Sequence, residues 1–227
     1  NWLRMCLVDN FDDNVYAGGD DPSLFRIRAF QLSASNDDYI IDLWAACYNM
    51  INCANNVLKY VPEIKDPKLD LKVDGQITRR QQILGEATYL RAMKYFDLVR
   101  MFDGVPMPLT PTESTDPESV NLARTPGDQV YAQLIRDLEY CLTVLPDRYS
   151  DETQTRGRAT KGAASAMLAQ IYATMVPADW GKVEQYTTNV ISNVGVYSLH
   201  PSFEELFDGF HYNNSESIIE IQFQSPN

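Results

Sequence analysis

Two related stretches of sequence decide the fold class. Residues 85–95 read GEATYLRAMKY and residues 162–172 read GAASAMLAQIY. Glycine, alanine, a long aliphatic side chain, alanine and tyrosine recur at matching positions, with an offset of 77 residues (162 − 85). That offset is about two helix-hairpin units of roughly 34 to 40 residues. Small side chains at matched positions let neighbouring helices approach closely, so we expect a mainly α fold of stacked tetratricopeptide-like α-hairpins. A chance similarity between two amphipathic helices is the competing interpretation.

Helical periodicity continues on both sides of these stretches. Apolar side chains recur at three- and four-residue steps between residues 39 and 60, and Pro62 ends this pattern. Thr78 is a suitable N-cap for a helix that runs through Phe102 and places Leu90 inward. Three more helices are predicted at about 126–145, 160–176 and 179–193.

The two ends of the chain differ from this helical part. Residues 1–38 form a loop-rich segment with glycine and proline breakers. Residues 217–224 alternate apolar and polar side chains like a half-buried strand, and residues 196–199 are the nearby candidate partner. We therefore expect a helical scaffold over residues 39–227, with a minor strand component near the C-terminus. Because this strand has only one short candidate partner, we also expect the scaffold to be truncated and a missing C-terminal part to complete its packing.

Composition excludes several classes of protein. The 227 residues include 19 Lys and Arg against 31 Asp and Glu, which gives a net charge of −12. A nucleic-acid partner is not expected because a polyanion would be repelled. No segment approaches the run of about 20 apolar residues that a membrane-spanning helix needs. At 44% hydrophobic residues, the chain can bury a substantial core.

No catalytic or cofactor motif is present in the sequence. The two histidines, His200 and His211, lie in no triad-like or zinc-protease pattern, and no phosphate-binding loop occurs. We therefore expect no enzymatic activity, no metal and no cofactor. An acidic run could supply oxygen ligands for Ca²⁺, but a solvated acidic loop is the competing interpretation; its members are Asp9, Asp12, Asp13, Asp20 and Asp21.

The remaining polar and sulfur-containing residues have structural interpretations. Cys47 and Cys141 are expected to be small core residues, and Cys47 and Cys53 face apart on one helix and cannot form a disulfide. Arg158 and Lys161 lie near a helix start, where the helix dipole disfavours cations. Each should therefore have a carboxylate or carbonyl partner.

Blocks of residues along the chain resemble the SusD/RagB family. The first two blocks are Trp44 to Asn55 (W-x3-Y-x2-I-x2-AN) and Gly85 to Pro106. They are followed in family order by Arg124 to Leu138, Leu145-Pro146, Gly157 to Ala164, Trp180 and Asn214 to Ile218. Each block alone is weak, but the ordered set spans about residues 40 to 223. Cys47 and Cys53 within the first block are mild departures from the family pattern.

The resemblance implies both a function and a location. Family members are surface-exposed lipoproteins of the outer membrane that capture oligosaccharides or other nutrients. They ride on a SusC-like TonB-dependent transporter and have no catalytic role. The helical half is the scaffold and much of the transporter-facing surface. The resemblance further implies that the lipid-anchored N-terminal cysteine and most of the C-terminal ligand-binding part lie outside this chain.

Candidate ligand-binding residues cluster around the start of the first long helix. Sugar sites combine flat aromatic faces with amides, carboxylates and guanidinium groups that bond paired hydroxyls. The candidates with these properties are Asp20, Arg28, Asn36, Asp37, Tyr39, Trp44 and Asn49. Trp44 also lies on the apolar stripe of the helix, so a core role competes with a stacking role. Asn36 or Asp37 is equally suited to cap the helix.

Two other functions remain open at this point. A helical-repeat adaptor would bind a protein or peptide partner through the same scaffold. A hydrolase would need two carboxyl groups flanking a sugar, a geometry that the linear sequence does not exclude.

Overall fold

The computed structural model describes residues 22–31, 38–73, 77–193 and 196–222. The chain forms two compact units, residues 1–50 and 51–227. In the first unit, helix α2 (Pro22–Arg28) lies within the segment that was expected to be loop-rich, and its Ile27 is fully buried. Helix α3 (Asp38–Tyr60) begins in the first unit and ends in the second.

The second unit is built mainly of helices. Its long helices are α4 (Arg79–Phe102), α6 (Gly127–Val144), α8 (Lys161–Thr174) and α9 (Trp180–Ile191), with the short helices α5 (Pro117–Val120) and α7 (Glu152–Gly157) in the connections. Single 3-10 turns lie at η2 (Val61–Glu63), η3 (Pro67–Asp70) and η4 (Glu204–Phe207). The strands β1 (Lys72–Val73) and β2 (Ile77–Thr78) form a two-stranded antiparallel ladder.

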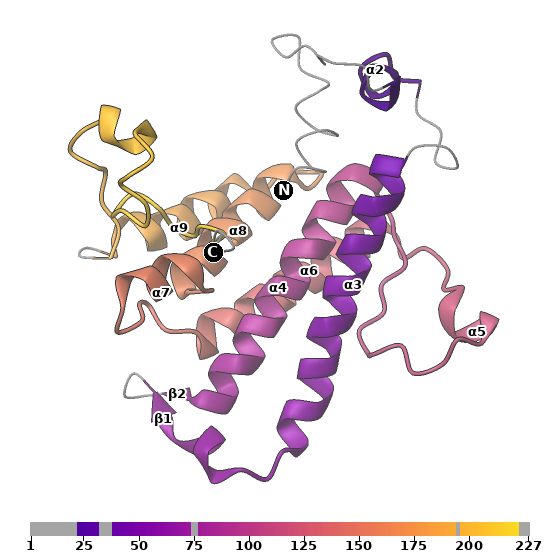
Figure 1. Ribbon diagram of the computed structural model, residues 1–227, viewed down its shortest axis with the longest axis horizontal. Helices are drawn as coiled ribbons and strands as arrows, with labels where there is room; N and C mark the ends of the chain where they lie inside the picture. The colour runs from indigo at the N-terminus through magenta and orange to yellow at the C-terminus, as the bar shows by residue number, and fades with distance from the viewer. Residues whose placement is uncertain (1–21, 32–37, 74–76, 194–195, 223–227) are drawn as a thin grey trace. The chain divides into compact units, whose positions relative to one another are not determined.

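Consecutive long helices pack against one another: α4 against α6, α6 against α8, and α8 against α9 (Figure 1). The α4–α6 pair is antiparallel, because residues with increasing numbers on α4 contact residues with decreasing numbers on α6. Arg91 pairs with Asp137, and the ring of Phe96 lies edge-on to Tyr131 with centroids 6.5 Å apart. The predicted mainly α fold of stacked helical hairpins is confirmed.

The predicted helix ends agree with the structure to within two residues because the sequence carries explicit stop and start signals. Pro62 lies in η2, directly after α3. Thr78 caps α4 through a capping box: its side chain accepts a hydrogen bond from the Gln81 backbone N–H at 3.2 Å, and the Gln81 side chain accepts one from the Thr78 backbone N–H at 2.9 Å. Together these two bonds satisfy two backbone donors that the helix start would otherwise leave unpaired.

The matched positions of the two repeats are buried, with one exception. Ala92 and Tyr95 on α4 are fully buried, and their counterparts Ala169 and Tyr172 on α8 are nearly so. The prediction for Leu90 is wrong: it is 40% exposed, although its counterpart in α8 is buried. The buried residues of α4 include Gln82, Gly85, Ala92 and Phe96, and Leu90 is not among them.

Gly85 shows how closely α4 and the end of α6 approach one another. A Cβ atom at Gly85 would lie 2.7 Å from Cγ2 of Val144 and 2.9 Å from Cδ2 of Leu145. Only glycine leaves room for these two side chains. The expectation that small residues permit close approach of the helices therefore holds here.

The strand predicted over residues 217–224 is not formed in its described part, residues 217–222. Alternation of side chains does not make a strand unless a second segment offers a continuous ladder. Here, the backbone bonds are scattered: Ser198 N–H donates to Ser215 O at 3.0 Å, and Glu220 N–H donates to Arg156 O at 2.6 Å. The two-stranded ladder of the described residues lies instead at β1 and β2.

A long connector between α4 and α6 is fastened to the helices by backbone and amide bonds. Val105 and Thr125 form an isolated antiparallel bridge. Asn55, almost fully buried on α3, donates from Nδ2 to Pro108 O at 2.9 Å and to Thr110 O at 3.2 Å. Asn55 thus has a structural role, because it holds the connector against the helix.

Candidate functional site

The structure places four of the seven predicted ligand-binding residues, all in the first unit. Arg28 ends α2 and is half-buried, Tyr39 and Trp44 are half-buried on α3, and Asn49 is exposed. Asp20, Asn36 and Asp37 lie outside the described residues, as does the acidic run over residues 9–21.

Helix α3 does not bring Tyr39, Trp44 and Asn49 onto one face. Each is five residues from the next, and five residues of an α-helix turn through about 500°, or about 140° net. Trp44 instead pairs with Tyr48, one turn later, with ring centroids 4.9 Å apart and planes inclined at 43°. The half-buried Trp44–Tyr48 pair offers a partly accessible aromatic surface, whereas the neighbouring Leu43 and Cys47 are the buried residues.

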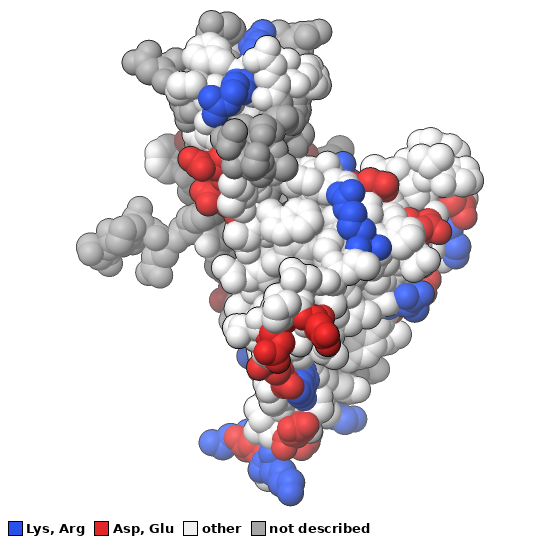
Figure 2. All heavy atoms as spheres, turned by 90° about the vertical axis from the view of Figure 1, so that its right-hand side faces the viewer, with Lys and Arg blue, Asp and Glu red and all other residues white. Residues whose placement is uncertain are grey.

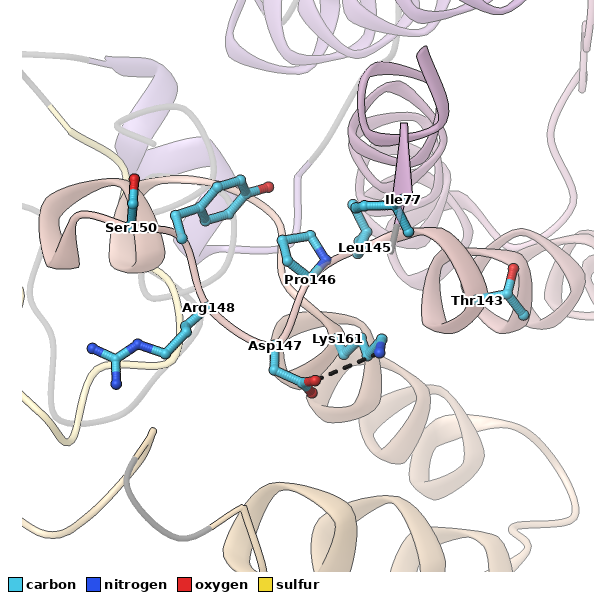
Figure 3. A pocket seen from close by; sticks show the side chains of 9 residues that line it. Ile77, Thr143, Leu145, Pro146, Asp147, Arg148, Ser150 and Lys161 are labelled. Atoms are coloured by element: carbon cyan, nitrogen blue, oxygen red, sulfur yellow. Dashed lines mark ion pairs between the residues drawn. The ribbon is translucent and has the colours of Figure 1, made fainter. Parts of the chain in front are cut away.

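A second candidate surface lies in the second unit, where the chain turns from α6 into α8. Two adjoining hollows, with volumes of about 780 and 430 Å³, share Asp147 and Lys161 as a common wall. We call them together the polar groove. The larger hollow is also lined by Thr143, Arg148 and Ser150 (Figure 3). The smaller is lined by Ser165 on α8, by Asn189 on α9 and by Ser192 and Asn193 just after α9.

The local sequence explains why the groove forms at this point. Helix α6 ends at Val144, and Pro146 follows in the turn, where it cannot continue the helix. Helix α8 begins at Lys161 after its N-cap Thr160, whose hydroxyl accepts a hydrogen bond from Ala163 N–H at 3.1 Å. The backbone N–H of Lys161 donates to Pro146 O at 3.0 Å, which holds the turn beside the start of α8.

Asp147 is the polar centre of the groove. Its Oδ2 lies 3.5 Å from Nζ of Lys161, and its Oδ1 accepts a hydrogen bond from Nδ2 of Asn193 at 3.4 Å. Both contacts are long, and the side chains of Asp147 and Lys161 are 54% and 39% exposed. The predicted carboxylate partner of Lys161 is therefore present, but the pair is loose and open to solvent.

Behind the groove, the predicted partner of Arg158 is also present. Nη2 of Arg158 donates to both carboxylate oxygens of Glu86, at 2.6 and 2.8 Å, and the guanidinium lies 4.7 Å from the centroid of the Tyr149 ring. The Tyr149 hydroxyl contacts Glu86 Oε1 at 3.0 Å and donates to Ala159 O at 2.8 Å. Burial, with a smaller contribution from Glu86, raises the pKa of Tyr149. Tyr149 is thus a neutral structural anchor and not a proton acceptor.

The chemistry that the groove offers is hydrogen bonding. Its lining includes one carboxylate, one ammonium and one guanidinium group, with hydroxyls and primary amides around them. One carboxylate does not make the pair that glycoside hydrolysis requires. Among the residues that the structure describes, no group of three or more His, Cys, Asp or Glu could hold a metal ion.

The sequence signalled only part of this groove. The sequence predicts a partner for Lys161 because a cation at a helix start needs one, but the identity of that partner depends on how the turn after α6 folds. Asn189 and Asn193 carried no signal, since polar residues near the end of an amphipathic helix are ordinary.

Figure 2 shows Lys and Arg interspersed with Asp and Glu over the described residues of the face that it presents. None of the described helices is long and apolar enough to cross a membrane.

Comparison with known proteins gives one consistent result. Residues 23–173 match the SusD-like family model described as "Starch-binding associating with outer membrane". The SusD-like protein P2 of Formosa agariphila is 30% identical over 169 residues, which cover 73% of this chain and 30% of that protein. The chain spans about a third of the length of the curated relatives it matches.

Solved structures show the same fold. Surface glycan-binding protein A from Bacteroides uniformis is similar with a TM-score of 0.81 and 26% identity, over 97% of this chain and 46% of that one. A laminarin-binding SusD-like protein is similar with a TM-score of 0.76 and 25% identity, over 96% of this chain and 44% of that one.

Proposed function

Since the chain belongs to the SusD-like family, we propose that it is the helical part of a non-catalytic protein that captures glycans at the outer-membrane surface. The observation that carries the proposal is the family match, which extends from α2 to the end of α8 and so includes the whole α4–α6–α8 stack. In this proposal, the captured oligosaccharide passes to a SusC-like TonB-dependent transporter, and an N-terminal lipid anchor is the membrane contact.

We assign a share of the ligand site to the first unit. Trp44 and Tyr48 supply a partly accessible aromatic surface for the apolar face of a pyranose ring. Arg28, Tyr39 and Asn49, together with Asp20, Asn36 and Asp37, supply groups that bond sugar hydroxyls. Catalysis is not part of the proposal, because the sequence carries no catalytic motif.

Titration calorimetry with neutral oligosaccharides tests the proposal. Replacing a stacking or hydroxyl-bonding side chain should weaken binding about tenfold, which corresponds to about 1.4 kcal/mol. The informative variants are Trp44→Ala, Tyr39→Ala and Arg28→Ala. Tyr60→Ala is the matched control, because Tyr60 is an exposed tyrosine at the far end of the same helix.

Unchanged affinity in all three variants, with the fold intact, would remove this surface from the site. Hydrolysis of the glycan that disappears when one carboxylate is replaced would overturn the non-catalytic assignment. Recovery of the protein from outer membranes together with a large β-barrel transporter would support delivery, and recovery without one would count against it.

One observation favours the alternative of an adaptor that binds a protein or peptide. Leu199, Phe203, Phe207 and Phe210 are each at least 75% exposed in the segment around η4. The rings of Phe203 and Phe207 contact each other with centroids 5.2 Å apart, and contiguous exposed apolar side chains mark protein interaction surfaces. A peptide partner that binds the chain and is lost in Phe203→Ser, while no glycan binds, would favour the adaptor.

A further inference from the structure

We infer that the polar groove is a second glycan-binding surface, which holds a neutral, uncharged oligosaccharide through Asp147, Lys161 and Asn189. This inference rests on the proposed function and extends it to residues outside the predicted site of the first unit. It follows from the placement of the charged pair, from the balance of donors and acceptors and from the size of the hollows.

The placement of the charged pair does not serve helix stability. The helix dipole favours anions at helix N-termini and cations at C-termini. Lys161 is nevertheless the first residue of α8, and Asp147 comes three residues after the end of α6. Their mutual contact is long and solvent-exposed, and such pairs contribute only about 0–1 kcal/mol. Departures from local stability rules concentrate where a protein binds or reacts.

The balance of groups around the pair fits a neutral polyhydroxy ligand. The Asp147 carboxylate accepts hydrogen bonds, the Lys161 ammonium donates them, and their charges cancel. The amide of Asn189 and the hydroxyl of Ser192, exposed at the rim of the smaller hollow, can each donate and accept. Arg148 extends away from Lys161 (Figure 3), so the two cations do not converge on a shared anion position.

The size of the hollows suits a short sugar chain better than a protein surface. Volumes of about 780 and 430 Å³ fall in the range of small-molecule sites. Protein interfaces are anchored by buried aromatic and apolar side chains. Tyr149, the one aromatic residue that lines the larger hollow, is itself buried beneath Arg158. Without an accessible stacking face, binding should be weak, in about the millimolar range.

Protein-observed NMR resolves the two surfaces in one experiment. The ¹⁵N-labelled chain is titrated with a panel of neutral hexasaccharides (laminari-, malto-, xylo- and mannohexaose), with a xyloglucan heptasaccharide and with an acidic oligogalacturonide. We expect at least one neutral ligand to shift the backbone amides of Lys161, Gly162 and Asn189. Asp147→Ala and Asn189→Ala should weaken these shifts about tenfold, since each removes a hydrogen-bonding partner. Asp128→Ala and Asn121→Ala are matched controls at exposed positions outside the groove.

The pattern of shifts distinguishes a failure of the groove inference from a failure of the proposed function. Shifts at α2 and α3 without shifts at the groove would overturn the groove inference and leave the proposed function standing. Shifts at the groove that survive Asp147→Ala and Asn189→Ala unchanged would also overturn it, as would tighter binding of the oligogalacturonide than of any neutral sugar. No shift anywhere with any ligand would count against both. Thermal midpoints of the variants, expected within about 2 °C of the parent chain because the groove pair is exposed, exclude misfolding as the cause.

Discussion

Arg91 of α4 and Asp137 of α6 form a buried bidentate ion pair. Nη2 of Arg91 lies 3.0 and 2.9 Å from the two carboxylate oxygens of Asp137, and Nε lies 3.1 Å from Oδ2. Nη1 of Arg91 also donates to Oδ1 of Asn55 at 3.1 Å, so α3, α4 and α6 meet at one guanidinium group. Burial raises the pKa of Asp137, and the contacts with Arg91 and Gln133 oppose that shift.

Removal of one partner from this pair should be costly. Arg91→Ala leaves the Asp137 carboxylate buried and uncompensated, so we expect a loss of about 3–5 kcal/mol in the free energy of unfolding. Arg91→Lys keeps the positive charge but cannot form the bidentate contact with the carboxylate. Its free energy of unfolding should therefore lie between those of the parent chain and of Arg91→Ala. Lys65→Ala, at an exposed position outside this network, is the control and should change stability by less than about 0.5 kcal/mol. Urea unfolding measures all three, and equal midpoints for Arg91→Ala and Lys65→Ala would contradict the structural role.

Gly85→Ala should destabilise the α4–α6 contact. Alanine is the better helix former by about 1 kcal/mol, but its Cβ would overlap Val144 and Leu145. Overpacking of this kind costs about 1–3 kcal/mol, so the net effect should be a loss. Gly181→Ala in α9 is the matched control, since its Cβ would meet nothing closer than Asp179 Oδ1 at 3.5 Å. Thermal unfolding should show a lower midpoint for the first variant and an equal or higher one for the second; the reverse order would refute close approach.

The capping box at the start of α4 should be worth about 1 kcal/mol. Thr78→Ala removes the acceptor for the Gln81 N–H, and caps of this kind typically contribute that amount. Thr78→Ser keeps the hydroxyl and should retain most of the stability. Chemical denaturation distinguishes the two, and an equal loss in both variants would show that the cap bond contributes nothing.

The cysteines should differ in reactivity. Cys53 is exposed on α3, whereas Cys141 is buried on α6, where burial raises the pKa of its thiol. Because the thiolate is the reactive form, iodoacetamide at pH 8 should label Cys53 quickly and leave Cys141 unlabelled until the chain is unfolded. Peptide mapping by mass spectrometry identifies the labelled site. Rapid labelling of Cys141 in the folded chain would mean that the α4–α6 interface opens easily.

Tyr186 should make stability depend on pH in the alkaline range. Its ring stacks on Tyr172 with centroids 5.8 Å apart, and burial raises its pKa to about 12, with Glu139 adding to the shift. The folded chain therefore keeps this proton more tightly than the unfolded chain, whose tyrosines lose theirs near pH 10. The stability contribution is complete below pH 10 and is lost as pH rises through 12. Tyr186→Phe has no titrating hydroxyl at this position, so its free energy of unfolding should fall less between pH 10 and pH 12. Parallel plots of unfolding free energy against pH for the two proteins would contradict the raised pKa.

The accuracy of the sequence-based predictions depended on whether the deciding interaction was local. The helix boundaries were predictable because Pro62 and Thr78 act on their own neighbours in the chain. The helical pattern of apolar residues predicts that Leu90 points inward, but its exposure depends on which face of α4 the neighbouring helices cover. The strand near residue 220 was predicted from alternation alone, and alternation cannot supply a pairing partner.

The residues of the two candidate surfaces also differ in how far they could be predicted from the sequence. Aromatic and amide residues near the start of α3 could be selected by chemical type, and their role in binding remains a prediction. The polar groove could not be found from the sequence, because it joins the turn after α6 to residues near the end of α9, more than 40 positions away along the chain. Such a site depends on the stacking of helices and has no signature within any one segment.

The connector between α4 and α6 gives the molecule a natural attachment point. The Val105–Thr125 bridge closes its base, and Thr112 N–H donates to Oδ1 of Asn52 at 2.9 Å to fix its first part. Beyond these clamps, residues 115–123 are exposed, and α5 buries no side chain. A fluorescent dye attached near Asn121, or an epitope tag inserted there, would therefore lie in an exposed loop that is fixed at both ends. Extra residues in such a loop cost little folding free energy. Living cells carrying such a tagged protein could report directly whether this part of the chain faces the surrounding medium.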